Sequence, residues 1–168
     1  MRHVISILLQ NESGALARVA SMFATRGFNI ESLSVAPTED DTVSRLTLVT
    51  SGTEEVIAQM SKQLAKLIDV VAIADRTSID HIERELGLLK LRVADSAQGS
   101  IHEMLEGIGA KVIDDNPEHL IVEVTGSEDE LDAFLSNLPE GVELVTVVRS
   151  GPLVVSRGAW SLIDQSEY

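Results

Sequence analysis

One stretch of the chain decides the fold: residues 4–23, which read VISILLQNESGALARVASMF. The apolar run over residues 4–9 predicts a buried strand. Leu16, Val19 and Phe23 follow at the spacing of the apolar face of an amphipathic helix. A strand that passes directly into a helix is a building block of layered folds that contain both helices and sheets.

Similar patterns continue along the rest of the chain. Apolar residues at helical spacing predict three further helices, at 56–68, 101–108 and 131–138. The remaining apolar segments predict further strands, at 28–35, 43–49, 70–74, 86–93, 111–114, 120–124 and 142–148. Two predicted helix starts, Ser51-x-x-Glu54 and Ser127-x-x-Glu130, have the spacing of capping boxes.

The predicted elements follow the order strand–helix–strand–strand–helix–strand, and this order occurs twice. It is the split βαβ, or ferredoxin-like, arrangement. A local echo supports the repeat, because residues 49–56 (VTSGTEEV) resemble residues 124–131 (VTGSEDEL). The sequence therefore predicts an α+β fold with two tandem ferredoxin-like βαββαβ domains. The predicted boundaries are 1–76 for the first domain, 77–158 for the second and 159–168 for a tail.

Several predicted strands carry apolar residues on both faces, as Val4-Ile5 and Val147-Val148 illustrate. Two helices cover one face of such a sheet, and a second face turned to water would alternate polar and apolar residues. Either the other domain or another subunit must cover the second face. Because the pattern occurs in both halves, we expect homo-oligomerisation. Residues after Ser150 show no clear period and are expected to form a tail.

Composition excludes several classes of protein. The 168 residues contain 13 Lys and Arg against 27 Asp and Glu, a net charge of −14, and 5 aromatic residues. Nucleic-acid affinity comes mainly from cationic side chains and stacking aromatics, so no nucleic-acid partner is expected. The absence of cysteine excludes disulfides, thiolate zinc sites and iron–sulfur clusters. No segment approaches the roughly 18 apolar residues of a membrane helix, so we expect a cytoplasmic protein without membrane contact.

No pattern of catalytic or metal-binding residues is found. The four histidines do not form the His-Glu-x-x-His zinc motif, and neither a Gly-x-Ser-x-Gly elbow nor a phosphate loop is present. Gly107-Ile108-Gly109 lacks the third glycine of a dinucleotide motif and is interpreted as a helix end. Acidic turns such as Glu39-Asp40-Asp41 are explained by solvation, with a divalent-cation site as the alternative. We therefore predict no catalytic residue and no metal ligand.

The segment Gln10–Leu16 has features that suit a ligand. The first turn of a helix presents unpaired amide donors and the positive end of the helix dipole, which attract an anion such as an amino acid's carboxylate. Gly14 lets a ligand approach the backbone closely, and Asn11 can both donate and accept hydrogen bonds. The alternative is a capped helix with a glycine in its first turn, and the local sequence alone favours that alternative.

Two longer segments resemble a known family. Residues 6–19, with Asn-Glu-Ser-Gly-Ala-Leu at 11–16, and residues 26–38, with Gly-Phe-Asn-Ile-Glu-Ser-Leu at 27–33, resemble the bacterial acetohydroxyacid synthase (acetolactate synthase) small subunit. The similarity covers residues 1–158 and is strongest over the first 75. Further matching segments are 44–47, 62–70, 149–151 and 156–158. Phe28 stands where tyrosine is common in the family.

The resemblance implies an N-terminal ACT domain, the ferredoxin-like module that senses amino acids. It also implies that the chain has no activity of its own and is the regulatory subunit of a transferase. Such a subunit activates a large catalytic subunit and confers feedback inhibition by valine in branched-chain amino acid (valine, leucine, isoleucine) biosynthesis. No cofactor is expected in this chain, because thiamine diphosphate, Mg and FAD are expected on the catalytic subunit.

The resemblance places the effector site at a homodimer interface. Asn11, Gly14 and Ala15 would hold valine from one subunit's strand–helix loop, and Asn29 and Ile30 would complete the pocket from the neighbouring subunit. An apolar wall separates ligands that differ by one methylene by only about 1–3 kcal/mol, so leucine and isoleucine are alternative effectors.

Two other functions are weighed against this one. An ACT-type sensor could serve another enzyme or a transcription system. A stand-alone enzyme on a ferredoxin-like scaffold would need Arg18 or Arg45 beside Asn11 for phosphate chemistry. Arg18 is instead expected on a solvated helix face.

Overall fold

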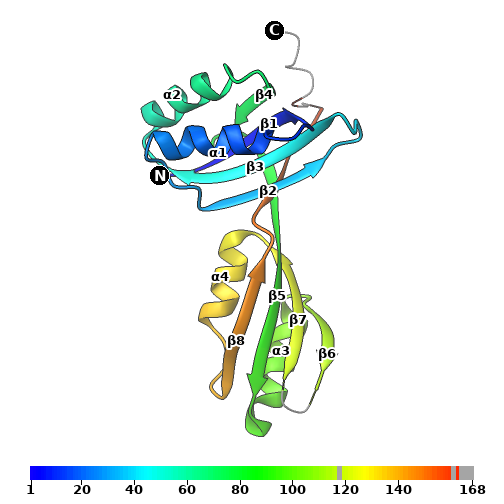
Figure 1. The fold of residues 1–168 in the computed structure, drawn as a ribbon. Coiled ribbons are helices and arrows are strands. Elements are labelled where there is room, and N and C mark those ends of the chain that lie inside the picture. The colour runs from blue at the N-terminus through cyan, green and yellow to red at the C-terminus, as the bar shows by residue number, and fades with distance from the viewer. Residues whose placement is uncertain (117–118, 160–161, 163–168) are drawn as a thin grey trace. The chain divides into compact units, whose positions relative to one another are not determined.

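The computed structural model describes residues 1–116, 119–159 and 162, and its elements are drawn in Figure 1. The chain divides into two compact units. The first contains Met1–Ile82 and Leu153–Tyr168, and the second contains Glu83–Pro152. Each unit holds one βαββαβ repeat, which confirms the predicted α+β fold with two ferredoxin-like domains.

The repeat of the first unit is formed by β1 (Arg2–Gln10), α1 (Ala15–Thr25), β2 (Ser32–Pro37), β3 (Val43–Ser51), α2 (Glu54–Leu64) and β4 (Val70–Asp75). Its strands lie in the order β2-β3-β1-β4, and every neighbouring pair is antiparallel. β2 and β4 are therefore the edge strands of this sheet.

The repeat of the second unit is formed by β5 (His81–Val93), the 3₁₀ turn η1 (Asp95–Ala97), α3 (Gln98–Gly107), β6 (Lys111–Asp115), β7 (Leu120–Gly126), α4 (Glu128–Ser136) and β8 (Val142–Arg149). The strand order β6-β7-β5-β8 matches that of the first unit strand for strand. β5 begins five residues before the predicted start of this strand, so its first residues precede the second unit.

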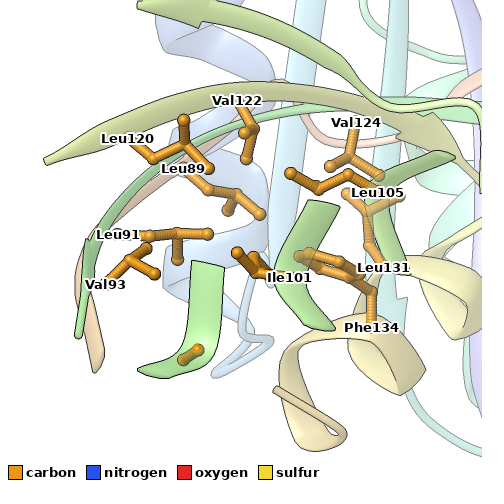
Figure 2. Close-up of a cluster of buried hydrophobic side chains, with 11 residues drawn as sticks. Leu89, Leu91, Val93, Ile101, Leu105, Leu120, Val122, Val124, Leu131 and Phe134 are labelled. Atoms are coloured by element: carbon orange, nitrogen blue, oxygen red, sulfur yellow. The ribbon is translucent and has the colours of Figure 1, made fainter. Parts of the chain in front are cut away.

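In each unit, one sheet face packs against helices. Ile5, Ile7 and Leu9 alternate along β1 and contact Val19 and Phe23 of α1. Figure 2 shows the corresponding cluster in the second unit, where sheet residues meet α3 and α4. Full burial of an aliphatic or Phe side chain contributes about 1.5–3 kcal/mol, so these two clusters supply most of the stabilisation of their units.

The other face of the first sheet is covered by the end of the same chain. β9 (Leu153–Ser156) pairs with β5, and its Val154 packs against Val4 and Val49. Leu162 packs on Leu8 and Ala72. The apolar residues of β1 are thus buried on both faces within one chain, without the second subunit that their pattern suggested.

The end of the chain differs from the sequence prediction in two respects. Residues 153–156 form a strand, whereas no regular structure was predicted after Ser150. Residues 153–158, which were assigned to the second domain, lie in the first unit. Of the predicted tail 159–168, only Ala159 and Leu162 are among the described residues.

The helix starts test the two predicted capping boxes. The box at Ser127 is confirmed, because its backbone N–H donates to the Glu130 carboxylate (2.7 Å) and its hydroxyl accepts from the Glu130 N–H. The box at Ser51 is wrong. Ser51 still pairs with Arg2 in the β-ladder, so the chain turns into α2 two residues later, with Thr53 as the N-cap.

The end of α1 explains why β2 begins later than predicted. Gly27 adopts a φ of +73°, and the Phe28 N–H donates to the Phe23 carbonyl, which closes the last helical turn. Residues 26–28 therefore belong to the helix terminus, and strand pairing begins at Ser32. In the described ranges, no helix has the length and apolar character needed to cross a membrane.

Candidate effector site

The candidate site lies in the first unit, where β1 ends and α1 begins. Gly14 is the N-cap of α1 and has a φ of +90°. An L-residue in this left-handed conformation costs roughly 1–2 kcal/mol, which explains a glycine at this position. Within the part of the chain that the structure describes, no side chain caps α1, and its first turn contains no acidic residue.

Two other helix starts differ from this arrangement, whereas α3 also begins without a side-chain cap and without an acid in its first turn. α2 is capped by the Thr53 hydroxyl and carries two glutamates in its first turn. α4 is capped by Ser127 and carries three acidic residues there. Acidic side chains complement the positive end of the helix dipole. α1 lacks both devices. Its Ala15 N–H donates to the Glu12 carbonyl (3.2 Å), so the amides that follow Ala15 and the helix dipole are what α1 offers to an external anion.

Asn11 is held in place by the turn between β2 and β3. Its backbone N–H donates to the Thr42 carbonyl (2.7 Å), and its Nδ2 donates to the Asp41 carbonyl (2.8 Å). The Nδ2 bond uses the donor side of the carboxamide and fixes its orientation. The Oδ1 atom is left as the acceptor that a ligand's ammonium group needs.

A cavity of 260 Å³ opens beside this loop. Its wall is formed by the end of β1, the first turn of α1 and residues 35–37 of β2. Its polar lining residues are Gln10, Asn11, Ser44 and the acidic Glu12, and Ala15, Leu16 and Val35 supply apolar surface. Larger cavities of 700 Å³ and 520 Å³ contain none of the five predicted site residues. The smaller cavity therefore fits the candidate site best.

The predicted residues Asn29 and Ile30 do not reach this cavity within one chain. Thr50 donates its hydroxyl to the Asn29 carbonyl (2.7 Å), and Ile30 packs against the core of the first unit. Both precede β2, whereas the cavity lies at the end of β2. The five steps between the six residues of β2, at about 3.4 Å each, place these two ends about 17 Å apart. Their contribution from a neighbouring subunit remains a prediction.

Arg18 and Asp69 brace the loop and were not predicted as site residues. The Arg18 Nε and Nη2 atoms both donate to the Asp69 carboxylate, with Nη2 2.6 Å from Oδ1. The side chain of Asp69 is 4% exposed. Hydrogen bonding across this pair holds the pKa of Asp69 below its ordinary value and raises the pKa of Arg18.

The prediction that Arg18 lies on a solvated helix face is confirmed, but its partner was not predicted. The side chain is 47% exposed, but its guanidinium is bound to a nearly buried carboxylate. One local signal pointed toward the loop, because long helical side chains lean toward the helix N-terminus and Arg18 lies four residues after Gly14. The partner Asp69 comes from the turn before β4 and has no local signal.

The arginines of the alternative enzymatic hypothesis are not brought together. Arg45 pairs with Leu8 across β1 and β3, and Leu8 points away from the face that packs on α1. Arg18 extends from α1, on the other face of the same sheet. The two cations therefore lie on opposite sides of the sheet and do not form a joint phosphate site with Asn11.

Comparison with known proteins identifies two families along the chain. A family described as the AHAS small subunit-like ACT domain matches residues 5–72, and one described as the small subunit of acetolactate synthase matches residues 84–158.

Full-length relatives show the same pattern. The acetolactate synthase small subunit of Haemophilus influenzae is 42% identical and covers 97% of this chain and 100% of its own length. The isozyme 3 small subunit of Salmonella typhimurium is 44% identical, over 94% of this chain and 97% of its own. The crystal structure of the Thermotoga maritima small subunit has a TM-score of 0.85 at 33% identity, over 95% of this chain and 99% of its own.

Proposed function

The chain belongs to the acetolactate synthase small-subunit family, and from this premise we propose that it activates the catalytic subunit and confers feedback inhibition by valine. The family role is that of a regulatory subunit in a transferase complex. In this proposal the thiamine diphosphate, Mg and FAD belong to the catalytic subunit, and this chain contributes control.

One observation carries the proposal: α1 begins without a cap or an acid, directly beside an apolar-walled cavity. A valine zwitterion needs donors for its carboxylate, an acceptor for its ammonium group and an apolar wall for its side chain. The first amides of α1 suit the carboxylate. The Asn11 Oδ1 suits the ammonium group, and Ala15, Leu16 and Val35 suit the isopropyl group.

The proposed homodimer forms through the edge strand β2. One side of β2 pairs with β3, and the outer face of the sheet is already occupied by Val154 and Leu162. β2 and β4 are the two edge strands, and β2 is the one that lies between Asn29-Ile30 and the cavity, so its free edge is the proposed surface on which a second copy extends the sheet. An antiparallel pair of β2 strands places the start of one beside the end of the other. Asn29 and Ile30 of each copy then approach the other copy's cavity.

Titration calorimetry of the purified chain tests the effector. We expect heat on addition of valine, and a markedly weaker response to valinamide, which lacks the carboxylate that α1 would bind. Leucine and isoleucine identify the preferred effector. No heat with any of the three branched-chain amino acids would refute the effector assignment.

Reconstitution tests the regulatory role. We expect the chain to bind a protein that forms acetolactate from pyruvate, to raise its turnover, and to lower that turnover when valine is added. A bound partner without this activity would support the alternative, an ACT-type sensor that serves another system.

A further inference from the structure

We propose that Arg18 and Asp69 are a positioning pair that holds the effector loop, residues 11–14, in its binding conformation and so sets the valine concentration at which the chain responds. This inference rests on the proposed function. It assigns regulation to two residues outside the cavity wall.

The connectivity around Asp69 supports this role. Its backbone carbonyl accepts a hydrogen bond from the Gln10 N–H (2.8 Å), and its carboxylate binds Arg18. Gln10 precedes the loop and Arg18 follows it, so one residue holds both ends of the loop. The turn at Asp41 and Thr42 holds Asn11 by two further bonds. The loop is therefore fixed between two anchors.

The pair also constrains the residue at position 14. A Cβ on Gly14 would lie 2.9 Å from the Arg18 Nη1 atom, so the guanidinium lies directly across the glycine. The backbone N–H of Arg18 donates a helical hydrogen bond to the Gly14 carbonyl (3.0 Å). A shift of the guanidinium therefore changes the space above the first turn of α1, where the ligand's carboxylate would bind.

The chemistry of the pair makes it hard to replace. A nearly buried carboxylate that loses its cation is left with an unpaired charge, which is strongly unfavourable. The bidentate contact uses the planar fork of arginine, and a lysine ammonium does not reproduce it. The orientation of the loop therefore depends on the guanidinium geometry as well as on its charge.

A second bidentate pair offers a matched control. In the second unit, Arg149 donates through Nε (3.0 Å) and Nη2 (2.6 Å) to the Glu85 carboxylate, whose side chain is also 4% exposed. This pair joins β5 to β8 and touches none of the five predicted site residues. Arg149→Gln removes this ion pair and also the contact of Arg149 Nη1 with the Asp132 carboxylate (2.6 Å), so it reports the effect of a loss of stability at least as large, away from the site.

The test compares Arg18→Gln, Asp69→Asn, the double variant and Arg18→Lys with the unmodified chain. Calorimetry gives the Kd for valine, and the reconstituted complex gives the half-inhibitory concentration of valine. We expect each single variant to weaken valine binding about tenfold and the double variant to be no worse than the singles, as for residues that act as one unit. Arg18→Lys should be intermediate, and Arg149→Gln should lower the melting temperature without changing the Kd for valine.

The outcomes separate the inference from the function on which it rests. If the unmodified chain does not respond to valine, the proposed function fails. If the unmodified chain responds and Arg18→Gln responds at the same concentration, the positioning role fails while the proposed function stands. Effects of the two single variants that add in the double variant, or an equal loss in Arg149→Gln, would also overturn the inference.

Discussion

The two repeats share one topology but differ where their first strand passes into their first helix. In the first unit, Asn11–Gly14 lead into α1 and leave the helix start open. In the second unit, the Ala94 N–H donates to the Gly141 carbonyl, and the turn η1 follows, in which the Ala97 N–H donates to the Ala94 carbonyl (2.8 Å). The first unit has the same kind of bond, because the Ala15 N–H donates to the Glu12 carbonyl (3.2 Å). The two junctions differ at the N-cap, which is Gly14 with a φ of +90° before α1 and Ala97 with a φ of −100° before α3. The shared fold therefore provides the helix start, and the N-cap residue distinguishes the two junctions.

The outer faces of the two sheets differ as well. Val154 and Leu162 cover the first sheet. In the second sheet, Leu88 and Val148 pair across β5 and β8 and are 39% and 58% exposed. A covered outer face is thus not a property of the repeat, because it depends on where the chain end returns. For the first unit, this leaves the sheet edges as surfaces for a second copy, and β2 is the edge beside the cavity.

Gly14→Asp should have the largest effect, because the new side chain would block the start of α1, where the ligand's carboxylate is proposed to bind. The new side chain meets a positive φ and the Arg18 guanidinium, and its carboxylate occupies the place of the ligand's own. We expect the response to valine to be lost in the reconstituted complex. The control is Gly99→Asp, which places an aspartate in the first turn of α3, where φ is not positive and a Cβ meets no atom within 4 Å. A Gly14→Asp chain that keeps its full valine response would contradict the placement of the site.

Leu162→Ala should have the next largest effect and tests the difference between the outer faces. Leu162 is 1% exposed, and truncation of a buried leucine costs about 2–5 kcal/mol. Val148→Ala, at an exposed position of the second sheet, should change the free energy of unfolding by less than about 0.5 kcal/mol. Urea unfolding of the two variants gives both values. Equal losses would show that the chain end does not stabilise the first sheet.

Residues that contact near neighbours in sequence were well predicted. The buried strand at 4–9, the helical spacing of Val19 and Phe23, and the capping box at Ser127 are local patterns, and the structure contains each of them, whereas Leu16 is exposed. The repeated element order then specified the fold, because a βαββαβ order leaves few ways to arrange an antiparallel sheet.

Residues whose partners are distant in sequence were not predicted. Asp69 contacts Arg18, which lies 51 positions earlier in the sequence, and Leu162, near the end of the chain, contacts Leu8, near its beginning. Neither contact leaves a periodic or motif signal. The junction at 10–16 was singled out because its helix start depends on local residues. The ion pair between Arg18 and Asp69 was not predicted because it depends on tertiary contacts.

The smallest effect concerns the start of α2, where sequence and structure name different capping residues. Thr53 accepts a hydrogen bond from the Val56 N–H, whereas Ser51 ends β3 and donates its hydroxyl to Glu31. Loss of an N-cap costs about 0.5–2 kcal/mol, so Thr53→Ala should lower the free energy of unfolding by about 1 kcal/mol and Ser51→Ala by less. Thermal unfolding without ligand measures both. Because α2 supplies its own cap, neither variant should change the Kd for valine.

In α1 the ligand itself would take the place of the cap, so saturating valine should raise the melting temperature of the unmodified chain but not that of Gly14→Asp.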